Sequence, residues 1–289
     1  MTHQLNPVAQ QRKLRAELRR AREHAGLTQK EVADLLEWSA SKIIRIETGA
    51  VGIGITDLKA LLGQYKVTDA KKTNELLDMA RSSKKSSWWD KYKNHLKPDF
   101  IQFLGFQESA SLVRQFQFLF IPGLLQTREY AEAMFDSYET DPEVTQSRVE
   151  VRMQRQHLLT RENGPRFSFV LDESTLRRQI GGATVMREQL LHLKEVSRYP
   201  SVDIHVLPFS IGVRPGMENS FSVLEFLPDD YENTDYVVQI EQATRDILLE
   251  NEPQTASQYV EYFVTLEGLS IAGDQFDATI DRLIAELPT

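Results

Sequence analysis

The segment from Ser39 to Arg45 combines hydrogen-bonding, basic and very small side chains in the way that a surface for reading DNA bases requires. An arginine such as Arg45 can donate two hydrogen bonds to one guanine. Ser41 can bond to base edges or phosphates, and the Ala40 methyl can contact the methyl group of thymine. Such contacts need a helix that presents these side chains together in the major groove, so the neighbouring sequence must supply that helix.

The preceding residues predict a helix that supports this surface. Gly26 tolerates positive φ and suits the end of a first helix. Thr28 and Glu31 have the spacing of a capping box, and Leu27 and Val32 that of a hydrophobic staple. A tight turn and a second helix are expected to follow.

Ser39 is expected to cap that second helix, and its apolar residues define which side is buried. Ile43 and Ile46 are three positions apart and therefore face the core together. Ala40, Ser41 and Arg45 then lie on the outer side. The whole segment, Gly26 to Gly49, predicts a helix-turn-helix.

The pattern T-Q-x-E-V-A from Thr28 to Ala33, followed by S-x-S-x-I-x-R-I-E-x-G from Ser39 to Gly49, resembles the Cro/repressor (XRE) class of DNA-binding domains. The resemblance covers Leu14 to Tyr65 and implies a five-helix bundle that binds double-stranded DNA as a homodimer at a two-fold-related operator. It also implies a structural ion pair between Arg22 and Glu47. The candidate DNA contacts are Thr28, Gln29, Ser39, Ala40, Ser41, Lys42 and Arg45.

Two features depart from that class. Ala40 stands where relatives often carry a long polar side chain, and the loop from Ala50 to Gly54 lacks the basic residues that many of them have. The alternative to DNA binding is a small helical bundle without that role. The full pattern favours the DNA-binding interpretation.

The amino-acid composition excludes several kinds of chemistry and indicates where in the cell the protein acts. The 289 residues contain no cysteine, which excludes disulfides and thiol chemistry. No run of about 18 apolar residues predicts a membrane span, and no hydrophobic signal segment begins the chain. We therefore expect a cytoplasmic protein that joins the nucleoid when bound to DNA and has no membrane partner.

Charge is distributed unevenly along the chain. Residues 1–85 carry 16 Lys and Arg against 10 Asp and Glu, a net charge of +6, whereas the rest carries −14. The polar stretch from Ser82 to Ser87 separates the two parts. We predict a DNA-binding domain over 1–85 and a regulatory or partner-binding domain over 86–289, whose acidic surface suits either a basic partner or simple solvation.

The second part predicts an α+β domain with a mixed β-sheet. Alternation of apolar and polar residues indicates strands, and longer helical patterns separate and follow them. The expected strands are Phe106–Phe116, Phe167–Leu171, Val202–Leu207, Phe221–Phe226 and Tyr236–Ile240. The expected helices are Arg128–Tyr138, Asp141–Thr160, Val185–Ser197, Gln254–Leu269 and Gln275–Leu287.

Arg148, Arg152 and Arg155 form a row on the predicted Asp141–Thr160 helix. Such a row could hold an anionic ligand or partner. The simpler interpretation, which we favour, is surface salt bridges with Glu143 and Glu150.

Further segments extend the resemblance over nearly the whole chain: WWDKY at Trp88–Tyr92, IPGLLQTREYAEAM at Ile121–Met134, RMQRQ at Arg152–Gln156 and LDESTLRR at Leu171–Arg178. They resemble an actinobacterial family that joins an XRE domain to an antitoxin-like C-terminal domain, in which PGLLQT is the most specific element. The resemblance implies a transcriptional regulator controlled through dimerisation or a small protein partner encoded nearby. It supplies no catalytic residue.

Motifs of catalysis and cofactor binding are missing from the sequence. The six histidines show no HExxH or paired spacing, and there is no GxSxG, GxGxxG or Walker A pattern. We expect no enzyme, no cofactor and no metal. An alternative regulator would sense a small molecule, with a pocket near Phe116, Phe118, Phe120 and PGLLQT, although a core role for these residues is the stronger expectation.

Overall fold

The computed structural model describes residues 6–226, 235–242, 245–250 and 252–288. The chain forms two compact units, Met1–Asp90 and Lys91–Thr289, so the division falls slightly after the expected one at Lys85.

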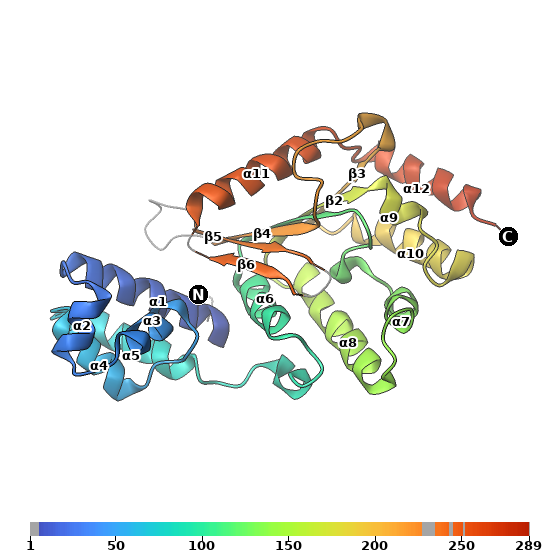
Figure 1. The fold of residues 1–289 in the computed structure, drawn as a ribbon. Coiled ribbons are helices and arrows are strands. Elements are labelled where there is room, and N and C mark those ends of the chain that lie inside the picture. The colour runs from blue at the N-terminus through green and yellow to red at the C-terminus, as the bar shows by residue number, and fades with distance from the viewer. Residues whose placement is uncertain (1–5, 227–234, 243–244, 251, 289) are drawn as a thin grey trace. The chain divides into compact units, whose positions relative to one another are not determined.

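The N-terminal unit is a bundle of α-helices (Figure 1). Its core consists of aliphatic side chains from every helix, with Leu14, Val32, Ile43 and Leu58 nearly inaccessible to solvent. The five helices expected for the N-terminal bundle are therefore present. They are α1 (Pro7–His24), α2 (Gln29–Leu35), α3 (Ala40–Thr48), α4 (Ile55–Gln64) and α5 (Ala70–Ser82), followed by a 3-10 turn, η1 (Trp88–Tyr92).

The C-terminal unit is built on a mixed sheet with the strand order β3-β2-β1-β4-β5-β6. β1, β2 and β3 run parallel, and β4, β5 and β6 continue from β1 as antiparallel neighbours. The mixed α+β prediction is confirmed. The strands are β1 (Leu112–Gln117), β2 (Arg166–Asp172), β3 (Val202–Leu207), β4 (Phe221–Phe226), β5 (Asp235–Ile240) and β6 (Ile247–Glu250).

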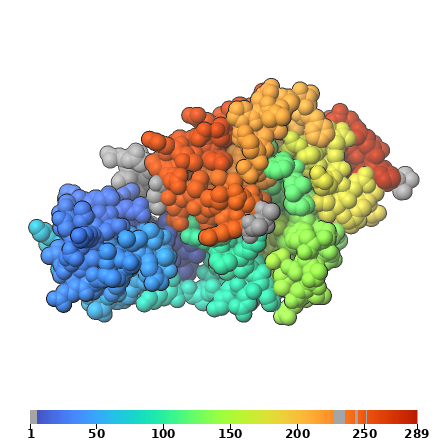
Figure 2. Space-filling model, in the orientation of Figure 1, coloured from blue at the N-terminus to red at the C-terminus, as the bar shows by residue number. Residues whose placement is uncertain are grey.

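Helices cover both faces of this sheet. α11 packs on one face against Phe116, Phe221 and Val238, which form an apolar cluster with Phe263. α6 and α8 lie on the other face, side by side in the ribbon and space-filling views (Figures 1 and 2). The helices and helical turns are α6 (Pro98–Ser109), η2 (Gly123–Leu125), α7 (Arg128–Asp136), α8 (Pro142–Arg155), η3 (Gln156–Leu159), α9 (Glu173–Arg177), α10 (Gly182–Val196), η4 (Phe209–Ile211), α11 (Pro253–Gly268) and α12 (Asp274–Glu286).

One strand prediction is wrong. Residues 106–109 belong to α6, which begins at Pro98 and ends at the extended residue Ala110, and the strand starts only at Leu112. α6 buries the consecutive residues 103–107, so its sequence lacks the one-sided apolar stripe of a surface helix. Without that stripe, the alternation of apolar and polar residues around Phe106 was interpreted as the pattern of a strand. The short edge strand β6 was not predicted.

In the part of the chain that the structure describes, no helix is both long enough and apolar enough to cross a membrane.

Candidate functional site

The helix-turn-helix is shaped by local hydrogen bonds. The capping box is present in full: the Thr28 hydroxyl accepts from the Glu31 amide, and Glu31 accepts from the Thr28 amide. In the turn, Glu37 adopts φ 55° and the Trp38 amide donates to the Ala33 carbonyl, which closes α2 in the Schellman manner. These contacts fix the angle at which the chain enters α3.

The outer side of α3 presents the expected side chains. Ile43 and Ile46 are buried, whereas Ala40, Ser41 and Arg45 are exposed. Among the described residues, the Arg45 guanidinium has no hydrogen-bond or ion-pair partner. An arginine held on a helix surface without an internal partner is available to a base edge or a phosphate.

Three other candidate contacts have partners within the unit. The Thr28 and Ser39 hydroxyls cap α2 and α3. Lys42 Nζ lies 3.0 Å from Asp57 Oδ2 and 3.5 Å from the centre of the Trp38 ring. Thr28 and Ser39 therefore cap the N-terminal ends of α2 and α3. To bind a DNA phosphate, Lys42 would have to give up its ion pair with Asp57.

Arg22 and Glu47 are brought together as the resemblance implied. Arg22 Nε donates to Glu47 Oε1 over 2.7 Å, and Gln29 Nε2 donates to Glu47 Oε2 over 2.8 Å. Glu47 is 3% exposed, and its hydrogen bond with Arg22 raises the pKa of the guanidinium. Gln29, a candidate DNA contact, thus also belongs to the buried network that joins α1, α2 and α3.

Arginines of α1 hold the end of α3, which the sequence did not reveal. Arg15 Nη1 donates to the Thr48 carbonyl and Arg19 Nη2 to the Glu47 carbonyl. Cations are favourable at a helix C-terminus because its last carbonyls lack partners. Gly49 has φ 82°, and a side chain there would collide with Arg15, so the glycine makes this arrangement possible.

The PGLLQT segment of the C-terminal unit is a braced loop. Buried Gln189 of α10 donates to the Leu125 carbonyl and accepts from the Thr127 amide, each over 2.7 Å. Gln126 Nε2 donates to the Ile121 carbonyl, and Arg152 of α8 donates to Gln126 Oε1 over 2.8 Å. The loop therefore joins α8 and α10.

Comparison with known families matches both units. A family described as a helix-turn-helix domain (HTH_31) matches residues 13–74, and one described as a domain of unknown function (DUF5753) matches residues 100–282. The chain belongs to the DUF5753 family. The first match supports an XRE-like DNA-binding regulator. No curated protein and no solved structure matches the chain.

The prediction made for the row of Arg148, Arg152 and Arg155 in the DUF5753 domain is wrong. Arg148 pairs with Glu139, and Glu150 pairs with Arg128 instead of with the row. Arg155 is 5% exposed and bonds to Gln107. The expected surface salt bridges with Glu143 and Glu150 are wrong, because Arg152 bonds to Gln126 and Arg155 turns inward to Gln107.

The suggested apolar pocket near Phe116 is occupied by the protein itself. Phe116 is fully buried in the cluster beneath α11, and Phe118 stacks on it while remaining 37% exposed. Leu124 and Leu125 of PGLLQT are also buried. Phe116, Leu124 and Leu125 have the core role that was the stronger expectation, whereas Phe118 is exposed and Phe120 is half-buried.

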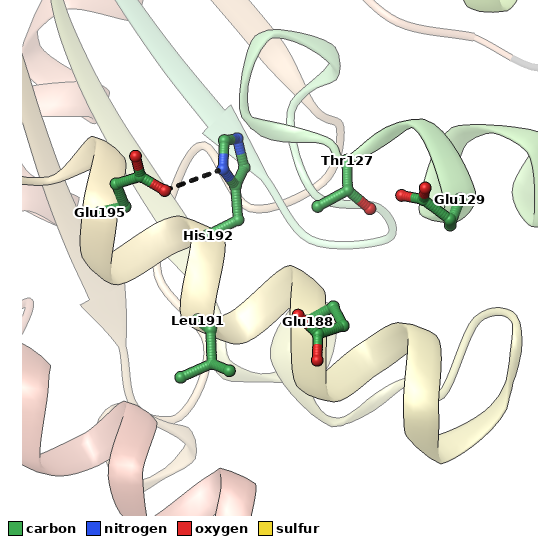
Figure 3. Close-up of a pocket in the computed structure, with 6 residues that line it drawn as sticks. All are labelled: Thr127, Glu129, Glu188, Leu191, His192 and Glu195. Atoms are coloured by element: carbon green, nitrogen blue, oxygen red, sulfur yellow. Dashed lines mark ion pairs between the residues drawn. The ribbon is translucent and has the colours of Figure 1, made fainter.

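A pocket of about 360 Å³ lies between the start of α7 and the outer side of α10 (Figure 3). Its carboxylates are exposed, and His192 Nδ1 is 4.0 Å from Glu195 Oε2. Burial lowers the pKa of His192, against the effect of Glu195, so the imidazole adds little positive charge at neutral pH. The pocket is therefore acidic. Its lining residues are Thr127, Glu129, Glu188, Leu191, His192 and Glu195.

Among the described residues, no group of three or more His, Cys, Asp or Glu side chains is placed to hold a metal ion.

Proposed function

We propose that the protein is a sequence-specific transcriptional regulator that binds a two-fold-related operator as a homodimer. The observation that carries this proposal is the exposed, unpaired Arg45 beside Ala40 and Ser41 on the outer side of α3. Arg45 reads guanine in each half-site, Ser41 bonds to a base edge or phosphate, and Ala40 packs on a thymine methyl. The chain acts as a cytoplasmic regulator and carries out no catalytic reaction of its own.

The remaining candidates position the domain on the sugar-phosphate backbone. Thr28, Gln29 and Ser39 lie at the starts of α2 and α3, where free amide groups and the helix dipole favour phosphates. Lys42 adds a cation once it leaves Asp57. Because such contacts release counterions, affinity for any DNA is expected to fall steeply with salt.

Replacing Arg45 with alanine should weaken operator binding by about 1–3 kcal/mol, mostly at one base pair in each half-site. The operator would first be defined by genome-wide occupancy of the tagged protein, and affinities measured by fluorescence anisotropy on operator and random duplexes. The affinity for random DNA should fall much less, because the contact that is lost is to a base.

Arg20→Ala is the matched control, because it removes the same charge from an exposed arginine of α1 whose contact is Glu17. Equal losses on operator and random DNA for Arg45→Ala, matching those of the control, would contradict base reading by Arg45. Occupied sites without a two-fold motif would contradict the dimer.

We further propose that the DUF5753 domain controls DNA binding through a small protein partner encoded nearby, in the manner of an antitoxin. The resemblance to actinobacterial regulators supports this, as does the acidic charge of residues 86–289. The acidic pocket offers three exposed carboxylates around the exposed Leu191, which suits a basic segment with an aliphatic side chain.

Charge reversal at Glu188 tests the partner proposal. Glu188→Lys should lower the association rate with the co-encoded small protein by roughly threefold or more at low salt, because complementary charge accelerates encounter. Stopped-flow or surface-binding kinetics measure the rate. Glu261→Lys on α11, also exposed, is the control. No association of wild-type protein with the small protein would refute the partner proposal, whereas equal effects of both variants would refute only the role of the pocket.

A further inference from the structure

A row of polar side chains crosses the DUF5753 sheet on the face toward α6 and α8. Gln115 of β1 lies opposite Ser222 of β4, which lies opposite Gln239 of β5. All three are at most 6% exposed. Polar groups in the middle of a covered sheet are costly to bury unless each has a hydrogen-bond partner. This row therefore needs an explanation beyond packing.

Two guanidinium groups from α8, that of the buried Arg155 and that of the half-buried Arg152, face the same side of the sheet. Arg155 donates twice to Gln107 Oε1 of α6, over 3.2 and 2.7 Å, and its guanidinium lies 5.1 Å from the centre of the Phe100 ring. Arg152 donates to Gln126 and lies 4.6 Å from the centre of the Phe135 ring. Among the described residues, no carboxylate lies within ion-pair distance of either. Neutral amides and rings hold these two cations.

The two cations are close to each other. A Cβ placed on Gly123 would lie 2.4 Å from Arg152 Nη1 and 3.7 Å from Arg155 Nη1, so the two nitrogens are separated by no more than the sum of these distances. Burial and the charge of Arg152 lower the pKa of Arg155 to about 9. The protein keeps both positive charges together at neutral pH, although they repel.

One carboxylate, Glu241, reaches this region from the end of β5. Its Oε1 accepts from Gln117 Nε2 over 2.6 Å and from Gln115 Nε2 over 3.4 Å. Burial and the charge of nearby Asp246 raise its pKa, and Asp246 itself accepts from Gln239. Neither Glu241 nor Asp246 forms an ion pair with Arg152 or Arg155, so neither guanidinium has a directly bonded carboxylate among the described residues.

Three buried polar atoms in the same layer have no hydrogen-bond partner: Gln107 Nε2, Ser222 Oγ and Gln239 Oε1. Gln107, Ser222 and Gln239 are each at most 3% exposed. Buried polar atoms in folded proteins nearly always have partners, from the chain, from water or from a ligand. Here the three atoms offer a donor, a hydroxyl and an acceptor near two guanidinium groups that have no ion-pair partner among the described residues.

We propose that Arg152, Arg155 and this polar layer form a binding site for a small organic oxyanion, a metabolite with a carboxylate or phosphate group and further hydrogen-bonding groups. The guanidinium pair receives the oxyanion. Gln107, Ser222 and Gln239 bond to the rest of the ligand. PGLLQT has a role here, because Gly123 leaves room for the guanidiniums and Gln126 orients Arg152. The site lies in the DUF5753 domain alone and does not depend on DNA reading by α3.

The test is titration of the full-length protein with sodium phosphate or sodium acetate at constant ionic strength, by calorimetry and thermal shift. At least one anion should bind saturably and raise the unfolding temperature, and the stronger of the two identifies the oxyanion group. Arg152→Gln should weaken binding about tenfold or more, and Glu241→Gln should strengthen it about threefold or more, because they remove charges of opposite sign.

Arg128→Gln is the control, because Arg128 is exposed on α7 and pairs with Glu150. Saturable binding of neither anion would overturn the site. If Arg152→Gln fails to fold, the Glu241→Gln variant still tests the proposed site. Unchanged or weaker anion binding by Glu241→Gln would also overturn the proposed site. A loss in Arg128→Gln equal to that in Arg152→Gln would show that only general surface charge attracts the anion, and would likewise overturn it.

Discussion

Replacing Glu47 with alanine is expected to destabilise the N-terminal unit by about 3–5 kcal/mol, because it leaves a buried guanidinium without its carboxylate. Glu47 accepts hydrogen bonds from Arg22 and Gln29, and the Arg22 side chain is only 11% exposed. A loss of this size is a large fraction of the stability of a small domain. Chemical denaturation followed by circular dichroism should show an early transition for this unit, with DNA binding lost alongside it.

Glu23→Ala is the matched control for that result. Glu23 lies 3.5 Å from the same guanidinium but is 60% exposed, so its removal should change stability by less than about 1 kcal/mol. Equal, small effects of the two substitutions would show that the Arg22–Glu47 contact is energetically unimportant despite its burial.

Replacing Gln189 with leucine should destabilise the C-terminal unit by about 2–6 kcal/mol, since two buried backbone groups lose their partners at about 1–3 kcal/mol each. Gln189 is inaccessible to solvent and is bonded to both Leu125 and Thr127. Leucine has a similar size, so the loss arises from hydrogen bonding more than from a cavity. Thermal and urea unfolding of the full chain measure it.

Glu188, the residue before Gln189, provides the control for this substitution. Glu188 is exposed on the same helix, and Glu188→Leu should leave the stability of the unit within about 0.5 kcal/mol of the wild type. If Gln189→Leu were equally harmless, PGLLQT would not depend on the bracing from α10.

The helix-turn-helix could be predicted from sequence because its determinants are local. Gly26, Thr28, Glu31 and Ser39 act on residues at most a few positions away. The structure shows Thr28 and Ser39 capping α2 and α3, and Gly26 with φ 69° directly after Ala25, the C-cap of α1. The hydrogen bonds from Arg15 and Arg19 to the end of α3 escaped prediction. They join residues distant in the chain, and their partners are carbonyl groups that every residue possesses.

The polar layer of the DUF5753 domain, with Arg152 and Arg155, could not be predicted from the sequence for a related reason. An arginine row at helical spacing indicates which residues share a face, and does not indicate whether that face is buried. Arg155 turns inward to Gln107 of α6 and Arg152 turns to Gln126, and both contacts join segments that are distant in the chain. The composition of α6, apolar on several sides, concealed the helix that carries Gln107.

The central place of β1 in the sheet has a consequence for synthesis on the ribosome. β1 emerges early, yet its partners β2 and β4 come much later, and Leu112 pairs with both Arg166 and Glu225. Such distant pairings form slowly, whereas the local contacts of the N-terminal helices allow rapid folding. A nascent chain is therefore expected to carry a folded DNA-binding domain before the DUF5753 domain has folded. Truncated translation products should therefore carry a folded helix-turn-helix domain without the domain that we propose controls it.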